Sequence, residues 1–320
     1  MNRLPIFSDI LDAQQVISKH LKRTPLYRSA GLSDLLSCHV LVKYENHQPI
    51  NAFKVRGGIN LISRLPDDLN SKGVITASTG NHGQSIAYAA KLFGVRATIV
   101  VPYNSNPDKV RAIERLGATI VEYGKDFDEA RTYSEHLANT EKYTYIHSAN
   151  EPYLIAGVGT IGLEILEDCP ETEYLFVPVG GGSGASGISI AVGAKNPNTK
   201  VIGVQSEQAP AVYLSWKAGK PISHDKMETF AEGLATRVGF DLTVEILKQN
   251  LADFVLVHDA EIRHAMKLIL EHTHNLVEAS GAASLAGAIK MKETLKGRTV
   301  AVVLSGANVT LSTLQQILKS

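Results

Sequence analysis

Short runs of apolar, mostly β-branched residues alternate along the chain with segments whose apolar residues recur at helical spacing. The runs are apolar on both faces, which is typical of strands that helices cover on two sides. The segments between them are amphipathic, as in 84–93, 108–116 and 261–272. We expect strands at 73–78, 97–102, 118–123, 174–179, 200–205, 254–258 and 299–305. This alternation of strand and helix predicts an α/β fold with parallel sheets.

Two glycines and one irregular segment help to divide the chain. Gly94 and Gly117 each follow a helical segment directly, where a residue in the left-handed conformation commonly ends a helix. Around 145–155, Asn, Pro and Gly interrupt the alternation. We therefore expect a small domain at 73–147 and a second part that contains 151–320. On pattern alone, the first 70 residues can pack with either part.

The charge balance narrows the possible functions. The 320 residues include 32 Lys and Arg against 32 Asp and Glu, so the formal net charge is zero. A nucleic-acid-binding protein needs an excess of basic residues, so we expect no nucleic-acid partner. Since 44% of the residues are hydrophobic, the chain has enough apolar surface to form a folded core.

Cysteine content and hydropathy indicate the cellular compartment of the protein. Cys38 and Cys169 are the only cysteines, so neither a disulfide framework nor a four-thiolate zinc site is available. The start of the chain lacks the apolar core of a signal peptide, and no apolar run approaches membrane-spanning length. We therefore expect a soluble, cytoplasmic protein with no membrane partner.

Polar residues follow the first predicted strand in the sequence ASTGNHGQ (77–84). Ser78, Thr79, Asn81 and His82 place hydroxyl, amide and imidazole groups beside the free N–H groups at the start of the next helix. Such a place favours an anion, and a carboxylate fits it. A capped turn that binds nothing explains these residues equally well.

A glycine-rich loop, PVGGGSGASG (178–187), follows another apolar strand. Its central residues leave many backbone N–H groups unobstructed, which suits a phosphate. These residues are Gly180, Gly181, Gly182, Ser183 and Gly184. Because ordering so many glycines costs conformational entropy, phosphate binding is favoured over a purely structural turn.

The same loop allows a second interpretation. GSGASG (182–187) matches the dinucleotide-binding pattern, and Glu207 lies about twenty residues further on, where an acidic ribose ligand is expected. An NAD-dependent dehydrogenase is therefore a distant alternative.

A lysine with apolar neighbours stands in NHQPINAFKVRGG (46–58). Lys54 lies between Phe53 and Val55, and Arg56 follows. Partial desolvation beside another cation is expected to lower the pKa of the amine and to make it a nucleophile toward aldehydes. A packed helix lysine whose amine reaches water is the structural alternative. At another strand end, in VVLSGANVT (302–310), Ser305 is either a turn residue or a ligand-binding hydroxyl.

Taken together, NAFKVRGG, ASTGNHGQ, GGGSGASG and LSGANVT resemble, in this order, the motifs of fold type II pyridoxal-phosphate enzymes. The chain looks most like the serine/threonine ammonia-lyases (threonine dehydratases) and also resembles serine racemases, over nearly its whole length. The resemblance implies a two-domain α/β fold similar to that of the tryptophan synthase β chain. Pyridoxal 5′-phosphate would lie between the small domain and a large domain formed by 1–70 and 151–320.

The resemblance also implies roles for the matching residues. Lys54 corresponds to the catalytic lysine that forms a Schiff base with the cofactor, and Thr79 to a catalytic hydroxyl on the opposite face. The residues matching cofactor-binding positions are Phe53, Lys54, Asn81, Gly180, Gly181, Gly182, Ser183, Gly184 and Ser305. Those matching the site for the substrate carboxylate are Ser78, Thr79, Asn81 and His82. Gly233 and Glu278 match further pocket positions, although Glu278 is equally well explained as an acid at a helix start.

Three segments depart from the family pattern. Ile50 and Asn51 stand close to Lys54 in place of a common Thr-Gly pair, so we expect the pocket beside the lysine to differ in shape from that of the family. Thr79 stands where racemases use serine, so we expect elimination to exceed racemisation. The segment 205–211 lacks both carboxylates of the divalent-ion site of serine racemases, so we expect no metal there.

The expected activity is the deamination of L-threonine or L-serine to 2-oxobutanoate or pyruvate and ammonia. Ser305 favours such an elimination, because a serine hydroxyl does not keep the cofactor's ring nitrogen protonated as a carboxylate does. The alternatives with the same cofactor are an amino-acid racemase and a dehydratase of another β-hydroxy amino acid. We also expect a homodimer or homotetramer and, because the chain stops soon after LSGANVT, no additional regulatory domain.

Overall fold

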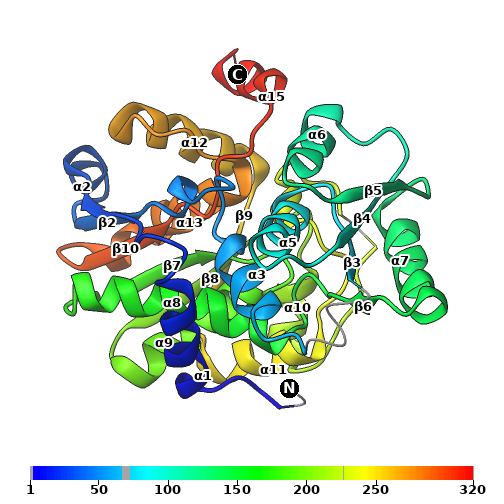
Figure 1. The fold of residues 1–320 in the computed structure, drawn as a ribbon. Helices are drawn as coiled ribbons and strands as arrows, with labels where there is room; N and C mark the ends of the chain where they lie inside the picture. The colour runs from blue at the N-terminus through cyan, green and yellow to red at the C-terminus, as the bar shows by residue number, and fades with distance from the viewer. Residues whose placement is uncertain (1–2, 67–72, 226, 320) are drawn as a thin grey trace.

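The computed structural model describes residues 3–66, 73–225 and 227–319, and it contains two β-sheets surrounded by helices (Figure 1). The larger sheet has six strands in the order β1–β2–β10–β7–β8–β9, and the smaller has four in the order β5–β4–β3–β6. Neighbouring strands are parallel except for β1, which runs antiparallel to β2. The predicted α/β class with parallel sheets is confirmed.

The strands of the larger sheet are β1 (Leu26–Arg28), β2 (His39–Lys43), β7 (Tyr174–Pro178), β8 (Lys200–Ser206), β9 (Asp253–Val257) and β10 (Thr299–Val303). Those of the smaller sheet are β3 (Val74–Ala77), β4 (Ala97–Val101), β5 (Thr119–Glu122) and β6 (Thr144–Tyr145). The helices are α1 (Phe7–Ile17), α2 (Ala30–Leu36), α3 (Lys54–Ile62), α5 (Asn81–Leu92), α6 (Pro107–Arg115), α7 (Phe127–Glu141), α8 (Pro152–Asp168), α9 (Ser183–Lys195), α10 (Ala211–Ala218), α11 (Asp241–Asn250), α12 (Asp259–Thr273), α13 (Ala279–Lys290), α14 (Lys292–Leu295) and α15 (Leu311–Lys319). Two short 3₁₀ turns are η1 (Glu45–His47) and η2 (Glu232–Leu234).

Every apolar run that was predicted as a strand forms one, whereas β1, β2 and β6 were not predicted. β1 has three residues and β6 has two, which is too short for a periodic pattern to be visible. The prediction that both faces of each strand are covered is wrong for β5. Its end residues, Thr119 and Glu122, are exposed, because β5 lies at the edge of the smaller sheet.

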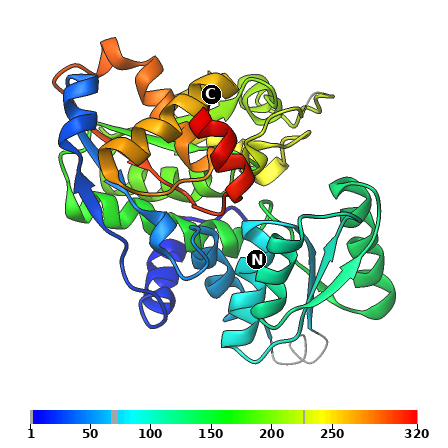
Figure 2. The ribbon, with the colours of Figure 1, turned by 90° about the horizontal axis from the view of Figure 1, so that it is seen from above.

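Apolar side chains fill both faces of the six-stranded sheet. On one face Phe176 and Val204 join the core formed with α12 and α13, and on the other face Val177 and Val201 join the core formed with α8 and α9. A third core combines the smaller sheet with α1, α3, α5 and the start of α8. Figure 2 shows the smaller sheet and its helices, in cyan to green, to one side of the larger part. Helix α3 packs against both α5 and α8, so it links the two parts.

Glycines act in two ways in this fold. Gly94 and Gly117 have φ values of +69° and +92°, which confirms their prediction as left-handed residues that end helices. Gly157 is required by close packing instead, because a Cβ there would lie 2.7 Å from the carbonyl oxygen of Arg56. Helices α3 and α8 therefore touch through their backbones, which fixes the start of α3.

The structure also bears on membranes and thiols. Among the described residues, no helix is both long enough and apolar enough to cross a bilayer. Cys38 and Cys169 are free and buried. Burial raises the pKa of both thiols, so neither is expected to react readily.

Candidate active site

Lys54, the first residue of α3, lies against the glycine-rich loop. Its amine donates a hydrogen bond to the carbonyl oxygen of Ser148, 2.9 Å away, and another to the Oγ of Ser183, 3.4 Å away. Ser183 lies within the loop and is the first residue of α9, and Ser148 precedes α8. The fold therefore joins the lysine to a loop that lies 129 residues further along the chain.

The surroundings of Lys54 change its acidity. Burial lowers the pKa of the amine from 10.5 to about 8, because the charged form loses hydration. Both hydrogen-bond acceptors are neutral oxygens, so no carboxylate compensates. The predicted lowering of the pKa is thus confirmed, but its cause is desolvation alone. Arg56, the expected second cause, is bound to carboxylates elsewhere.

We expect this amine to be detectable in the cofactor-free protein. With a limiting amount of an amine-acylating reagent, labelling of Lys54 should rise with pH and reach half of its maximum near pH 8, because only the neutral amine reacts. Peptide mass spectrometry between about pH 6 and about pH 11 measures the titration, with the exposed Lys22 as a reference for the reagent. A midpoint at about pH 10 or above, typical of a hydrated lysine, would contradict the desolvated environment.

The glycine-rich loop leads from the end of β7 into α9. Gly182 precedes the helix in the left-handed conformation, with φ of +96° and no side-chain cap. The amides of residues 180–185 donate no hydrogen bond to any other residue that the structure describes. A helix start with unpaired N–H groups attracts an anion through hydrogen bonds and the helix dipole. The loop therefore has the form expected of a phosphate site.

Neighbouring groups leave no room for side chains in this loop. A Cβ on Gly180 would lie 2.1 Å from the carbonyl oxygen of Gly233, and one on Gly184 would lie 3.0 Å from the ring of Phe53. The glycines thus allow the loop to contact two of the predicted pocket residues. Packing therefore requires glycine at these positions, and glycine also leaves the amides of the anion site unobstructed.

The loop after β3 provides a second helix start. Helix α5 begins at Asn81, and Gly80 supplies no side-chain cap. Ser78 uses its Oγ to accept the N–H of Gly80 at 3.2 Å, and Thr79 is half-buried. Like the glycine-rich loop, this loop presents backbone amides at a helix N-terminus, where a carboxylate is favoured.

His82 differs from the other residues of this loop. Its imidazole is buried, and its Nε2 lies 3.0 Å from the Oγ1 of Thr76 in β3. Burial lowers the pKa of the ring well below 6.5, and the charges of Lys54 and His147 act in the same direction. The side chain is therefore a neutral interior group, and what His82 offers at the helix start is its backbone N–H.

Glu278 brings together residues that follow strands of the two sheets. Its Oε1 accepts hydrogen bonds from Asn81 Nδ2 at 2.8 Å and from Ser280 Oγ at 2.7 Å, and its Oε2 accepts one from the backbone N–H of Asn308 at 3.1 Å. Asn308 Nδ2 in turn donates to Asn81 Oδ1 at 2.7 Å. Burial raises the pKa of Glu278 in spite of these bonds. Gly233 borders the same cluster, because a Cβ there would lie 2.6 Å from Ser280 Oγ.

Ser305 and Phe53 are joined through the backbone. Ser305 is buried two residues after the end of β10, and its carbonyl oxygen accepts the N–H of Phe53 at 2.9 Å. The Lys54 amine lies 5.6 Å from the centroid of the Phe53 ring. Phe53, Lys54, Ser305 and the glycine-rich loop therefore meet in one place, as their separate motifs predict.

Two residues of this place, His147 and Ser148, were not predicted from the sequence. The Nδ1 of His147 accepts the N–H groups of Ala149 at 3.0 Å and Asn150 at 2.8 Å, so the neutral ring carries its proton on Nε2. Burial lowers the pKa of this imidazole to about 4, and the charges of Arg131 and Lys54 add to the effect. A histidine at a strand end was the available signal, but β6 is too short to be recognised as a strand.

The departures from the family pattern leave the backbone intact. Asn51 has φ of +54°, a left-handed conformation that asparagine tolerates better than most residues where glycine is common. Ile50 is buried in the core, and Ala52 pairs with Gly306 in an isolated bridge. In the segment 205–211, Glu207 Oε2 lies 3.2 Å from His258 Nε2. Within the described residues, no three His, Cys, Asp or Glu side chains form a metal-binding group.

Comparison with known proteins gives concordant matches. Residues 17–306 match the model of the family described as "Pyridoxal-phosphate dependent enzyme". Over 310 residues the chain is 38% identical to L-threonine ammonia-lyase of Thermotoga maritima, and the alignment covers 97% of this chain and 77% of the relative. The processed form of threonine deaminase isoform 2 from Solanum lycopersicum superposes with a TM-score of 0.94 at 32% identity, covering 99% of this chain and 96% of the other. Maize serine racemase superposes with a TM-score of 0.93 at 33% identity, covering 99% and 98%.

Proposed function

The chain belongs to the family of pyridoxal-phosphate dependent enzymes, and from this premise we propose that it converts L-threonine or L-serine into 2-oxobutanoate or pyruvate and ammonia. The observation that carries the proposal is the contact between the Lys54 amine and Ser183, which joins a desolvated amine to a row of unpaired amides. The ammonia-lyase and deaminase activities named for the relatives support the reaction class.

The residues present fit pyridoxal phosphate. The cofactor carries an aldehyde and a phosphate, and the site offers a desolvated amine together with amides 180–185, which lack other partners among the described residues. The crowding around Gly180 and Gly184 excludes side chains that would cover this loop. We propose that Lys54 holds the aldehyde carbon, that residues 180–184 hold the phosphate, and that Phe53, Asn81 and Ser305 surround the ring.

The proposed mechanism assigns a task to each group of residues. When bound, pyridoxal phosphate withdraws electrons from the α-carbon of an attached amino acid. After the amino group of the substrate has displaced it from the aldehyde carbon, the neutral Lys54 amine would remove the proton from the α-carbon, and the β-hydroxyl would leave with a proton as water. A pKa of about 8 leaves part of the amine neutral near pH 7. Ser78, Thr79 and the amides at the start of α5 hold and orient the substrate carboxylate. Glu278, the residue before α13, positions Asn81 through its hydrogen bond.

A substrate panel tests this activity. We expect purified protein supplied with pyridoxal phosphate to release 2-oxobutanoate from L-threonine or pyruvate from L-serine, measured as the hydrazone or with a coupled reductase. L-Threoninol, which lacks the carboxylate, should react about 100-fold more slowly or worse, because the amides of α5 lose their ligand. Absence of any 2-oxo acid from both amino acids would refute the proposal, whereas equal rates for threonine and threoninol would refute only the carboxylate site.

Racemisation is the second candidate with this cofactor. The superposition on maize serine racemase favours it, and Thr79 stands where racemases use a serine. Threonine retains the hydroxyl but has a stiffer side chain, so we propose that racemisation is the minor reaction. Chiral chromatography of a reaction with L-serine compares D-serine with pyruvate. More D-serine than pyruvate would show that racemisation is the major reaction.

The dehydrogenase interpretation of GSGASG has lost its support. The chain belongs to a family with a different cofactor. Glu207, its proposed ribose ligand, is half-exposed and contacts His258.

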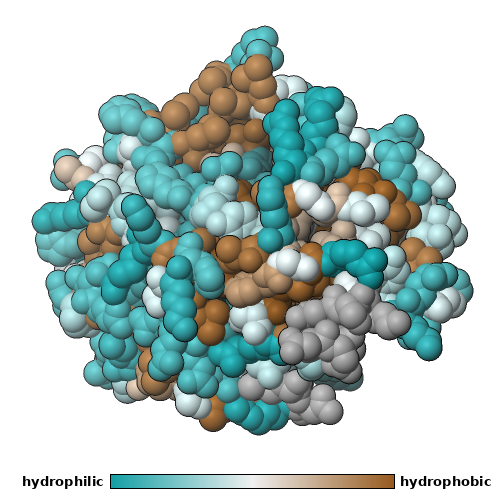
Figure 3. Space-filling model, in the orientation of Figure 1, coloured by the Kyte–Doolittle hydropathy of each residue, from teal (hydrophilic) through white to brown (hydrophobic). Residues whose placement is uncertain are grey.

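We also propose a two-domain organisation, a cytoplasmic location and a homodimer or homotetramer. The separate four-stranded sheet supports domains at 73–147 and at 1–70 with 151–320, and the two free, buried thiols suit a reducing compartment. Apolar side chains gather at the top of Figure 3, over α12 and α15. Leu311 and Leu318 of α15 and Leu276, which follows α12, are exposed. Such a patch supports self-association. Light scattering coupled to size-exclusion chromatography measures the mass.

A further inference from the structure

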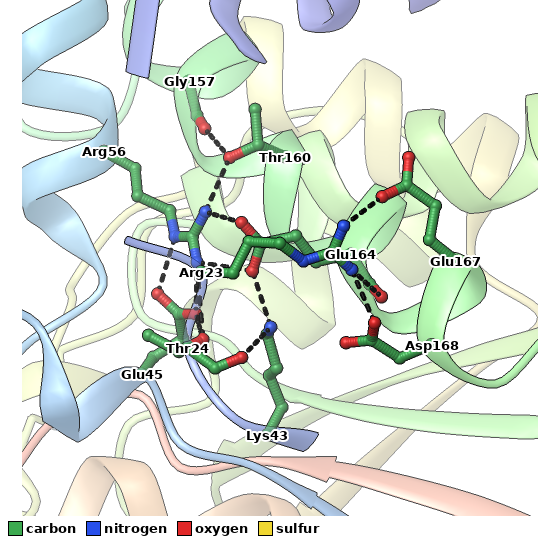
Figure 4. A network of polar contacts seen from close by, with 10 residues as sticks. All are labelled: Arg23, Thr24, Lys43, Glu45, Arg56, Gly157, Thr160, Glu164, Glu167 and Asp168. Carbon is green, nitrogen blue, oxygen red and sulfur yellow. Dashed lines mark hydrogen bonds and ion pairs between the residues drawn. The ribbon is translucent and has the colours of Figure 1, made fainter. Parts of the chain in front are cut away.

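Four charged side chains are buried together next to the first turn of α3 (Figure 4). They are Lys43 and Glu45, both 0% exposed, Arg56, 1% exposed, and Glu164, 6% exposed. Two positive and two negative charges make the group neutral as a whole. We call these four residues the buried charge cluster. It lies outside the set of residues proposed to hold cofactor or substrate.

Arg56 is the centre of the buried charge cluster. Its guanidinium binds Glu45 through Nε at 2.8 Å and Nη2 at 2.7 Å, and it binds Glu164 through Nη1 at 2.7 Å and Nη2 at 2.8 Å. Nη1 also donates to the Oγ1 of Thr160 at 3.1 Å. Both carboxylates are therefore held in the two-pronged geometry that arginine supports and lysine does not.

Lys43 completes the cluster from the end of β2. Its amine donates to Glu164 Oε2 at 2.6 Å and to the carbonyl oxygen of Thr24 at 2.8 Å. Arg23, the residue before Thr24, extends the network to the surface through Glu167 and Asp168 of α8, as Figure 4 shows. Each of the four charges of the buried charge cluster thus has a partner of opposite sign.

Stability alone is a poor reason for such a cluster. Removing charges from water costs several kcal/mol for each ion, and well-packed apolar residues of similar volume often give equal or greater stability. What the cluster provides that apolar residues do not is fixed geometry, since paired hydrogen bonds define both distance and angle.

The three segments joined by the cluster are also the segments that build the site. Arg56 lies two residues after Lys54, so the two side chains leave α3 about 200° apart. Glu45 adjoins Asn46, whose N–H donates to the carbonyl oxygen of Leu304, next to Ser305. Glu164 belongs to α8, which starts four residues after Ser148, the acceptor for Lys54.

We propose that the buried charge cluster is a positioning device for Lys54. By tying the first turn of α3 to the end of β2 and to α8, it sets where the Lys54 amine lies relative to Ser148, Ser183 and Ser305. Arg56 is then a positioning residue that acts through Lys54 without touching the ligand. The proposal rests on the proposed function in one respect, namely that the Lys54 amine binds the cofactor.

Two variants keep the net charge of the cluster and change its geometry. Arg56→Lys retains the positive charge but loses the fork that holds both carboxylates. The double variant Lys43→Met with Glu164→Gln removes one charge of each sign and leaves the Arg56–Glu45 pair. Because neither variant changes the total charge of the cluster, a shifted pH midpoint of Lys54 labelling would report a change in the position of the amine. His82 and His147, the titratable groups that act on Lys54 or are acted on by it, are untouched.

The first measurement needs no cofactor. In the cofactor-free protein we expect both variants to move the pH midpoint of Lys54 labelling by about 0.5 pH units or more from the wild-type value, since a displaced amine has a different hydration. The second measurement is the rate at which added pyridoxal phosphate becomes fixed on Lys54 by borohydride. We expect this rate to fall about 10-fold or more, because small displacements of a reacting group have large effects on rate.

Leu32→Ala is the matched control for lost stability. Leu32 is fully buried in α2, in the core on the α12 and α13 face of the larger sheet. The Leu32→Ala substitution should lower the midpoint of thermal unfolding without changing the pH midpoint of Lys54 labelling or the rate at which Lys54 captures the cofactor. If the cluster variants behave like this control, or if neither of them folds, the cluster is purely structural and the proposal is overturned. Failure of the wild-type protein to capture the cofactor on Lys54 would refute the proposed function instead, and the labelling midpoints would still decide about positioning.

Discussion

Replacing Lys54 with alanine is expected to reduce the release of 2-oxobutanoate from L-threonine by about 10⁴-fold or more. The substitution removes the only side-chain amine that the structure places against the glycine-rich loop within the described residues. Without it, the protein has neither a covalent anchor for the cofactor aldehyde nor the proposed base for the α-proton. The fold should persist, because a partly desolvated amine with two neutral acceptors contributes little to stability.

The measurement combines initial rates with mass spectrometry after borohydride reduction. The wild-type protein should gain the mass of one reduced pyridoxyl phosphate on the peptide that contains Lys54, and the variant should gain none there. Lys200→Ala is the matched control, because Lys200 is exposed at the start of β8, at the strand end opposite the glycine-rich loop. Its activity should stay within about twofold of wild type. A Lys54→Ala protein that retains a tenth or more of the rate would exclude Lys54 as the base.

Replacing Gly180 with alanine is expected to weaken the binding of pyridoxal phosphate by about 100-fold, or roughly 3 kcal/mol. The added methyl carbon would lie 2.1 Å from the carbonyl oxygen of Gly233, a backbone atom that has no rotamer with which to move away. The loop must shift, and its unpaired amides then leave the positions that suit a phosphate. Catalysis at saturating cofactor should fall less than affinity does, because Lys54 is unchanged.

Equilibrium titration of the cofactor-free protein, followed by absorbance or tryptophan fluorescence, gives the dissociation constant. Gly193→Ala in α9 is the control for the same chemical change. A Cβ there meets only Asn250 Oδ1, at 3.7 Å, and alanine is the better helix former by about 1 kcal/mol. This control should bind the cofactor as the wild-type protein does. Equal affinity of the Gly180→Ala protein would show that the loop does not hold the phosphate.

The candidate site was partly predictable because its chemistry is local in sequence. Gly180–Gly184 and Ser78–Asn81 each follow an apolar run directly, and a strand that turns into a helix exposes backbone N–H groups wherever it occurs. The lowered pKa of Lys54 also follows from its apolar neighbours in sequence. Of the two expected causes of this lowered pKa, only desolvation acts. The adjacent Arg56 contributes nothing, because its charge is bound by Glu45 and Glu164.

Other parts of the site depend on distances that no local pattern contains. The imidazole of His82 is buried beside Thr76, although its neighbours in sequence place it in a polar loop. His147 lies near Lys54 because α8 packs on α3, and the close packing depends on Gly57 and Gly157. The buried charge cluster gathers residues from β2, η1, α3 and α8, of which only Arg56 lies inside a recognised motif.

The sequence by itself determined the class of fold, the strands with long apolar runs, the two helix starts that suit anions and the lysine between them. These features follow from periodicity, from glycine and from the backbone groups at helix ends, and each of them is a property of a short segment. Only the tertiary structure decided that Lys54 meets Ser183, that Asn81 at the start of α5 binds Glu278 before α13, and that four charges are buried beside the lysine. The physical reason is that such contacts depend on the order of strands in the sheets and on helix packing, which join residues more than a hundred positions apart.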